Sequence, residues 1–223
     1  GLVNIQYVVY NHEVYVIEVN PRSSRTVPYI SKVTGIPMVD IATKIMFGAK
    51  LKDMGYKSGL YPAGDYVAVK VPVFSYEKLT DVDTKLGPEM KSTGECLGIG
   101  RNLEDALLKG LTAAGFDLKR EGGVLISVRD SDKQEVLPIA DKFEQMGFDI
   151  YATSGTQSVL HRNMIAANLV RKISDGEPNV ETLLDSGKIH YVISTSAKGR
   201  LPERDSVKMR RKSIERSICS LTA

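Results

Sequence analysis

The stretch GVLISVRDSDKQEVLPIADKFEQMGFDIYAT, residues 123–153, decides the fold of the second half of the chain. It predicts a strand over 123–128, a helix over 131–147 and a second strand over 148–153. A helix between two short apolar strands is typical of a βαβ unit, in which the strands run parallel.

The same alternation continues toward the end of the chain. We expect a helix over 155–163, a strand over 167–173, a short helix over 179–187 and a strand over 189–195, followed by a basic helix over 205–223. Strands and helices that alternate at this spacing indicate a parallel sheet wrapped by helices. The predicted fold class of this half is therefore α/β.

The first half is organised differently. Strand-like runs at 3–10 and 14–19 flank Asn11-His12-Glu13, and this predicts a β-hairpin with a three-residue loop. Residues 21–37 contain three prolines and Gly35, so we expect a loop with at most a short helix. Further elements are expected at these positions: a helix over 38–47, strands over 66–74 and 96–100, and an amphipathic helix over 102–114.

Composition excludes several classes of protein. The 223 residues are 42% hydrophobic and 26% charged, which is ordinary for a globular protein, and the net charge of +3 gives no argument for nucleic acid as a partner. No apolar run approaches the ~20 residues that a membrane span requires, so no membrane is expected. The two cysteines stand far apart, and the default location is a reducing cytoplasm.

The glycine-bounded, charged segment 115–123 predicts a domain boundary, with one domain over 1–118 and another over 119–223. The chain also begins within a strand-like run and without a methionine. We therefore expect it to be a C-terminal fragment of something longer.

Polar side chains gather at the open end of the predicted hairpin. A three-residue loop pairs Tyr10 with Val14, so that Gln6 faces Glu18 and Asn4 faces Asn20. Directly opposed side chains have Cβ atoms ~5 Å apart, so Gln6 and Glu18 could share one cation. On this register Val8, Tyr10, Val14 and Val16 continue the same face as apolar core.

Oxygen ligands from Glu, Gln and Asn without His or Cys suit Mg²⁺ or Mn²⁺, and a magnesium site with few protein ligands normally holds nucleotide phosphates as well. Arg22 and Arg25 follow directly, and guanidinium groups can grip a carboxylate, bicarbonate or phosphate. The alternative is an edge hairpin with a solvated end and two surface arginines.

The nine residues from Glu18 to Thr26, EVNPRSSRT, resemble the metal-binding signature of ATP-grasp enzymes. Residues 4–37 and 86–101 resemble the large subunit of carbamoyl-phosphate synthetases in particular, and the likeness extends over essentially the whole chain. The resemblance implies the C-terminal part of an ATP-grasp domain, of mixed α+β structure. By that likeness Gln6 and Glu18 bind metal and contact ATP phosphate, Asn20 binds a second metal, and Arg22 and Arg25 stabilise the phosphate and the reaction intermediate.

The family makes carbamoyl phosphate from bicarbonate, ammonia and two ATP, for arginine or pyrimidine synthesis. The resemblance therefore also implies a small glutaminase subunit that supplies ammonia and an oligomeric complete protein. We expect that the fragment alone does not turn over.

A second polar cluster collects at one edge of the predicted parallel sheet. Ser127 and Lys133 follow its first strand, residues 153–156 follow its second, Lys172 lies late in its third, and residues 194–196 follow its last. Open parallel sheets bind ligands outside the carboxyl ends of their strands, and hydroxyls, lysines and a helix N-terminus together suit a phosphate group.

This region resembles the methylglyoxal-synthase-like allosteric domain that ends the same large subunit. By that resemblance a nucleotide effector, UMP or IMP, is held by Lys133, Thr153, Thr156, Lys172, Ser194 and Ser196. No clear catalytic carboxylate stands out at these strand ends, so we expect binding and not chemistry.

Two other interpretations share parts of this pattern. The chain could be a stand-alone sensor of phosphate ligands in which the hairpin cluster is only structural. A biotin-dependent carboxylase also uses the grasp fold, but residues 120–223 are unlike the tail of such an enzyme and contain no biotin-carrier segment.

Overall fold

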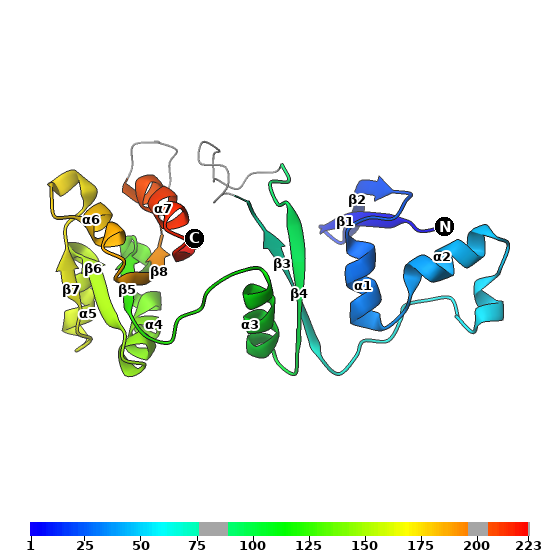
Figure 1. Cartoon of the computed structure of the whole chain (residues 1–223), viewed down its shortest axis with the longest axis horizontal. Coiled ribbons are helices and arrows are strands. Elements are labelled where there is room, and N and C mark those ends of the chain that lie inside the picture. Colours follow the sequence, from blue (N-terminus) through cyan, green and yellow to red (C-terminus); the bar gives the residue numbers. More distant parts are fainter. Residues whose placement is uncertain (76–88, 196–204, 223) are drawn as a thin grey trace. The chain divides into compact units, whose positions relative to one another are not determined.

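The computed structural model describes residues 1–75, 89–195 and 205–222, which form two compact units (Figure 1). Unit 1 comprises residues 1–72 and 95–114, and unit 2 comprises residues 73–94 and 115–223. Within the described residues, no helix has the length and hydropathy that a membrane crossing requires.

Unit 1 begins with the predicted hairpin, in which β1 (Asn4–Tyr10) pairs antiparallel with β2 (Glu13–Asn20). Its loop has two residues and not the three expected, because Tyr10 pairs with Glu13. Asn11 and His12 both have positive φ, 49° and 65°, as the favoured two-residue hairpin turn requires, and Asn tolerates this conformation well. The predicted loop length was therefore wrong.

A β-bulge restores the expected pairing at the open end of the hairpin. The register shifts between Gln6 and Tyr7, so that Tyr7 pairs with Val16 while Gln6 pairs with Glu18. One extra residue on β2, Ile17, absorbs the shift. The predicted Gln6–Glu18 and Asn4–Asn20 pairs are confirmed in spite of the shorter loop.

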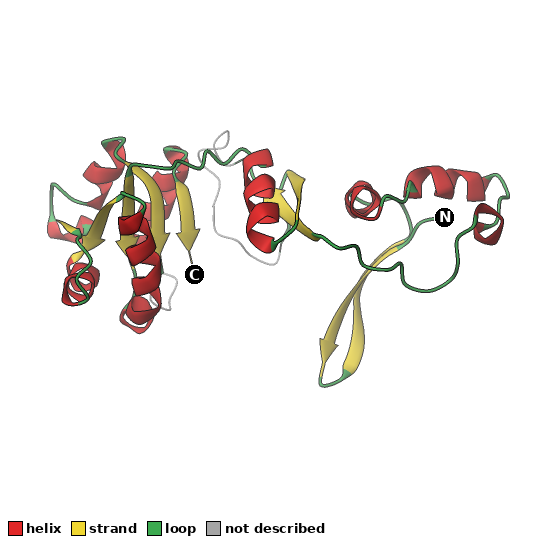
Figure 2. Ribbon diagram, turned by 90° about the horizontal axis from the view of Figure 1, so that it is seen from below, coloured by secondary structure: helices red, strands yellow, loops and turns green. Residues whose placement is uncertain are grey.

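The expected apolar core of the hairpin is not found. Val8 pairs with Tyr15 and Val9 with Val14, so Val8 and Val14 do not share a face as predicted. The apolar side chains of both strands are exposed, and Figure 2 draws the hairpin as a two-stranded ribbon whose tip lies away from α1 and α2. The cause of the wrong face assignment is the bulge, which inverts the alternation on one side of it.

Two helices follow, α1 (Thr26–Thr34) and α2 (Met38–Met46). Helix α1 is nine residues long in a segment expected to be mainly loop. Pro28 is tolerated because it lies in the first turn, where backbone N–H groups have no partner within the helix, and Gly35 ends α1 with a left-handed φ of 71°. Helix α2 confirms the prediction, and a 3₁₀ turn, η1 (Leu51–Met54), follows it.

The rest of unit 1 is built on β3 (Val67–Val73), β4 (Gly94–Gly100) and α3 (Leu103–Ala113), all three predicted. Strands β3 and β4 pair, and Asn102 caps α3 by accepting a 2.8 Å hydrogen bond from the N–H of Asp105. Strand β4 lies so close to α3 that a Cβ added to Gly98 would lie 2.5 Å from the N atom of Gly110.

Unit 2 contains the predicted parallel sheet. Its strands are β5 (Gly123–Ser127), β6 (Asp149–Thr153), β7 (Asn168–Val170), β8 (Ile189–Ser194) and β9 (Cys219–Thr222), in the order β7-β6-β5-β8-β9. Every neighbouring pair is parallel. Strand β9 corrects the prediction of one helix to the end of the chain, since the basic helix stops before Ser217, which has a φ of +53°.

Helices cover both faces of this sheet, as Figure 2 shows. On one face α4 (Lys133–Gln145) and α5 (Ser154–Arg162) pack on Val124 and Ile126. On the other face α6 (Val180–Asp185) and α7 (Asp205–Glu215) pack on Leu125 and Val192. Since successive side chains of a strand point to opposite faces, the continuous apolar run of β5 serves both cores.

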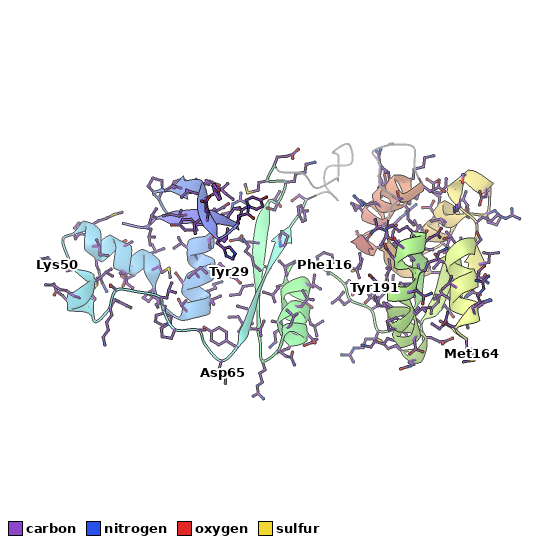
Figure 3. The ribbon with its side chains drawn as sticks, turned by 180° about the vertical axis from the view of Figure 1, so that it is seen from behind. Tyr29, Lys50, Asp65, Phe116, Met164 and Tyr191 are labelled. Atoms are coloured by element: carbon purple, nitrogen blue, oxygen red, sulfur yellow. The ribbon has the colours of Figure 1, made fainter. Side chains whose placement is uncertain are left out.

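An aromatic cluster belongs to the core between the sheet and helices α4 and α5. Tyr191 of β8, labelled in Figure 3, lies with its ring centroid 5.7 Å from that of Phe143 and 5.6 Å from that of Phe148. Its hydroxyl donates a 2.7 Å hydrogen bond to the carbonyl oxygen of Lys119. The ring thus packs in the core while the hydroxyl group keeps a partner, as buried tyrosines require.

Candidate functional site

The strand order of unit 2 sets the position of its candidate site. The chain builds β5, β6 and β7 toward one edge, then returns to the other side of β5 to add β8 and β9. The direction of growth therefore reverses between β5 and β8. Ligands of open parallel sheets bind outside the carboxyl ends of the strands at this switch point, where Ser127 of β5 lies beside Ser194 of β8.

Buried hydroxyls hold the floor of the site in place. The side-chain oxygens of Ser127 and Thr153 lie 3.2 Å apart, which ties the ends of β5 and β6 together. The hydroxyl of Thr156, which is buried, accepts from the N–H of Val128 at 3.4 Å. Ser194 is buried as well. The predicted residues Thr153, Thr156 and Ser194 thus lie at one edge of the sheet.

Lys133 turns its side chain toward the first turn of α5. A Cβ built on Gly155 would lie 2.8 Å from the Nζ of Lys133, so the ammonium group occupies the space that a side chain at position 155 would fill. The Lys133 side chain is only 16% exposed. The helix it faces has no acidic residue in its first turn and no hydrogen bond from the side chain of its N-cap, Thr153.

Two further charges lie beside Lys133. Its Nζ forms a 2.6 Å ion pair with Asp130 in a 3₁₀ turn, η3 (Asp130–Asp132). The hydrogen bond from Lys133, and then the positive charges of Lys133 and Lys172, lower the pKa of Asp130. Lys172 therefore belongs to the same group of charges, although it lies just beyond β7 and not within a strand as predicted.

The loop between β5 and α4 is fastened to the end of β8. Asp132 pairs with the Nε of Arg129 at 2.7 Å, and the N–H of Arg129 donates to the hydroxyl of Thr195 at 3.0 Å. Hydrogen bonds from Ser131, Arg129 and Thr195 lower the pKa of Asp132 to about 2. The carboxylate is therefore ionised at neutral pH and holds three groups of the site together.

These carboxylates correct the expectation that no clear candidate lies at the strand ends. Asp130 and Asp132 both follow β5, and both are already engaged with cationic side chains. The alternation of Asp and basic residues in RDSDK, residues 129–133, was the available signal in the sequence. Ser196, the last predicted effector residue, lies outside the described residues.

In unit 1, the strand pairing of the hairpin brings the predicted polar residues together. Gln6 pairs with Glu18, and Asn4 pairs with Asn20 at the next position on the same side. The Nδ2 of Asn20 donates a 2.6 Å hydrogen bond to the Oε1 of Glu18, so these two side chains reach the same point. Gln6, Glu18 and Asn20 are thus brought together at the open end.

The two arginines lie in the segment that leads from β2 into α1. Arg22 donates a 3.0 Å hydrogen bond to the carbonyl oxygen of Ser23, and Arg25 is the N-cap residue of α1. Both arginines are exposed.

The donor set of the hairpin fits a hard divalent cation. It offers one carboxylate and amide oxygens, which are ligands that Mg²⁺ and Mn²⁺ accept. In the part of the chain that the structure describes, no three His, Cys, Asp or Glu side chains gather as metal ligands. A cation held by Gln6, Glu18 and Asn20 would therefore need further oxygens, and nucleotide phosphates are the usual source.

Unit 2 is, by its sheet order, an open α/β domain with a polar edge, and unit 1 has mixed α and β structure. Residues 135–222 match the family model of the MGS-like domain, and residues 1–54 match that of the carbamoyl-phosphate synthase L chain, ATP binding domain. Over all 223 residues the chain is 49% identical to the carbamoyl phosphate synthase large chain of Lachnoclostridium phytofermentans.

The chain is therefore related along its whole length to the carbamoyl phosphate synthase large chain, and the resemblance drawn from the sequence is confirmed. So is the predicted fold class, an ATP-grasp end followed by a parallel-sheet, methylglyoxal-synthase-like domain. The chain spans 21% of the length of that relative.

Proposed function

We propose that this chain forms part of an ATP-dependent ligase that makes carbamoyl phosphate, with a catalytic segment within residues 1–118 and a regulatory domain within residues 119–223. The complete protein would use bicarbonate, ATP and ammonia from a glutaminase subunit. The 49% identity to a carbamoyl phosphate synthase large chain, over an alignment that includes all 223 residues of this chain, supports this proposal. We expect residues 1–223 alone to be inactive in synthesis, because the hairpin cluster is exposed and offers one carboxylate.

The regulatory assignment rests on one observation: the ammonium of Lys133 faces the N-terminus of α5. The N-terminus of a helix carries a partial positive charge, so a cation is unfavourable there and is stabilising at a C-terminus instead. The first turn of α5 has no carboxylate, and the ion-pair partner of Lys133 is the exposed Asp130 of η3. Two positive groups that face one another, with Lys172 nearby, are suited to bind an anion between them.

The remaining residues fit a nucleoside monophosphate. In this proposal Lys133, Lys172 and the first backbone N–H groups of α5 hold the phosphate, while hydroxyls at the strand ends hold the ribose. Residues that would contribute these hydroxyls are Thr153, Thr156, Ser194 and Ser196. UMP and IMP are the effectors to test first.

In the catalytic segment, we propose that Gln6, Glu18 and Asn20 hold Mg²⁺ or Mn²⁺ together with ATP phosphates. The cation would neutralise charge on the phosphates. Arg22 and Arg25 would bind the transferring phosphate and the carboxylate-like intermediate, because phosphoryl transfer spreads negative charge over oxygens that guanidinium groups can reach in pairs. Their proximity to the exit of β2 supports this role.

The two roles can be separated in the complete protein. Glu18→Ala should lower carbamoyl phosphate synthesis more than about a hundredfold while UMP binding is unchanged, since a lost electrostatic contact to the reacting charge costs on this order. Lys133→Ala should weaken UMP binding about tenfold or more, because it removes a charge-assisted hydrogen bond. Calorimetry and a product assay measure the two effects.

Gly155→Ala gives an independent check of the anion site. The added Cβ would meet the Nζ of Lys133, the end of a flexible side chain, so the ammonium should move while the fold stays intact. UMP affinity should fall without a loss of stability. Carbamoyl phosphate synthesis that survives Glu18→Ala would refute the metal assignment. UMP affinity that is unchanged in both Lys133→Ala and Gly155→Ala would refute the effector assignment.

A stand-alone sensor is the competing proposal. It would bind nucleotides with an affinity that does not depend on Mg²⁺ or on Glu18, and the complete protein would make no carbamoyl phosphate. The 49% identity of the whole of this chain to part of a synthase large chain favours the ligase.

A further inference from the structure

Asp130 stands apart from the other charged residues of the anion site. Its side chain is 95% exposed, and Lys133 is its single ion-pair partner within the described part of the chain. Asp132, by contrast, is 17% exposed and is bound to Arg129, Ser131 and Thr195. One carboxylate of η3 is therefore part of the scaffold, while the other is held by the same ammonium group that we assign to the phosphate.

The position of Asp130 has no evident structural reason. A solvated ion pair of this kind contributes little to folding stability, and η3 is already anchored through Asp132. What Asp130 does supply is negative charge at a place where Lys133, Lys172 and the N-terminus of α5 all present positive charge. It is the counter-ion of the site when no other anion is bound.

We propose that Asp130 is an internal competitor that lowers the affinity of this site for phosphate-bearing effectors. The inference rests on the proposed effector function. A bound phosphate must share Lys133 with the Asp130 carboxylate or displace it, and in either case two negative groups come close together. Asp130 thereby raises the effector concentration at which the domain responds, compared with a site that has the same cationic groups and no Asp130.

An opposite role is also physically reasonable, and the test separates the two. If Asp130 chiefly holds Lys133 in place for the ligand, its removal weakens binding. If Asp130 chiefly competes, its removal strengthens binding, and the gain is electrostatic. Lys133 is packed against Gly155 and only 16% exposed, so its position does not depend on the exposed Asp130 alone.

The experiment compares UMP binding to the full chain and to its Asp130→Asn variant by calorimetry. Neutralising one charge a few ångströms from the phosphate should tighten binding about three- to tenfold at low salt, and the gain should shrink as salt rises. Inorganic phosphate should follow the same trend, and uridine, which has no phosphate, should show no gain.

Asp141→Asn is the matched control. Asp141 lies in α4, eleven residues after Asp130, and is an exposed carboxylate that accepts a hydrogen bond from Gln145. The Asp141→Asn variant therefore has the same net charge as Asp130→Asn. UMP affinity should be nearly unchanged in it. An equal gain in both variants would assign the effect to net charge and overturn the inference.

The failures of the two proposals differ. If UMP binds, Lys133→Ala weakens it, and Asp130→Asn leaves it unchanged or weakens it, then the competitor role is wrong and the effector site stands. If neither UMP nor phosphate binds to the wild-type chain, the effector site is wrong and the competitor role falls with it.

Discussion

At the scale of single residues, Asp132 connects several polar groups of the proposed anion site. It accepts hydrogen bonds from Ser131, Arg129 and Thr195, and these lower its pKa from 3.8 to about 2. A carboxylate with a lower pKa in the folded state stabilises the fold above its unfolded pKa, and this contribution is lost as pH falls through the folded pKa.

Asp132→Asn should therefore lower the stability of unit 2 at pH 7, with a smaller effect in acid. The difference between the wild-type chain and the variant should narrow as pH falls from about 4 toward about 2, because the wild-type carboxyl group becomes neutral over that range. Urea unfolding at pH 7 and at pH 3 measures it. A difference that is the same at both pH values would mean that charge does not explain the stabilisation.

The sequence predicted the residue types of this site better than their partners. Lys133, Thr153 and Thr156 were found because polar residues after parallel strands must meet at one edge of the sheet. Asp130 and Asp132 were missed because a short 3₁₀ turn sets which carboxylate faces which cation, and no periodicity in five residues reports such a turn. Lys172 was placed in a strand that ends two residues earlier, at Val170.

At the scale of elements, close packing of β4 on α3 depends on glycine. A Cβ on Gly98 would overlap the carbonyl oxygen of Ala106 and lie 2.5 Å from the N atom of Gly110. Both atoms belong to the backbone of α3, which cannot move aside as a flexible side chain can. The LGIG segment, residues 97–100, therefore forms the end of β4 and packs on α3. This agrees with the strand expected over 96–100.

Gly98→Ala should destabilise unit 1 by about 1–3 kcal/mol or more, since an extra methyl group in a tight contact forces the backbone apart. Gly94→Ala in the same strand is the control, because a Cβ there would meet only Val73 at an ordinary 3.8 Å. Thermal unfolding of both variants measures the effect. Equal stability of the two would show that β4 and α3 can separate at little cost.

The hairpin shows what a strand pattern can and cannot predict. Alternation across β1 and β2 identified the Gln6–Glu18 pair, because chemistry on one face constrains the register. It could not reveal that a two-residue turn and a bulge at Ile17 together produce this pairing. The loop has one residue fewer than expected and β2 has one unpaired residue more, so the two differences cancel at the open end. Strand β9 was missed because a four-residue edge strand after a basic helix has too few positions to show a period.

At the scale of the whole molecule, the buried residues are divided unequally. Both apolar clusters of unit 2 draw only on residues between Val124 and Ile218, so this unit has cores of its own. In the described part of unit 1 the buried apolar residues are few: Val27, Ile41, Ala42, Val71 and Ala106. The free energy of folding of unit 2 should therefore depend little on unit 1, since burial is the main stabilising term.

A core mutation in unit 2 should therefore act within that unit. Leu160 of α5 is fully buried among residues of β5, β6 and α4, so Leu160→Ala should cost about 2–5 kcal/mol. Hydrogen exchange should speed up across the sheet of unit 2 and stay unchanged in β4 and α3. Met164, which is labelled in Figure 3 and 92% exposed, provides the control, since Met164→Ala should change stability by less than about 0.5 kcal/mol. Faster exchange in α3 of the Leu160→Ala variant would show instead that the two units fold as one cooperative body.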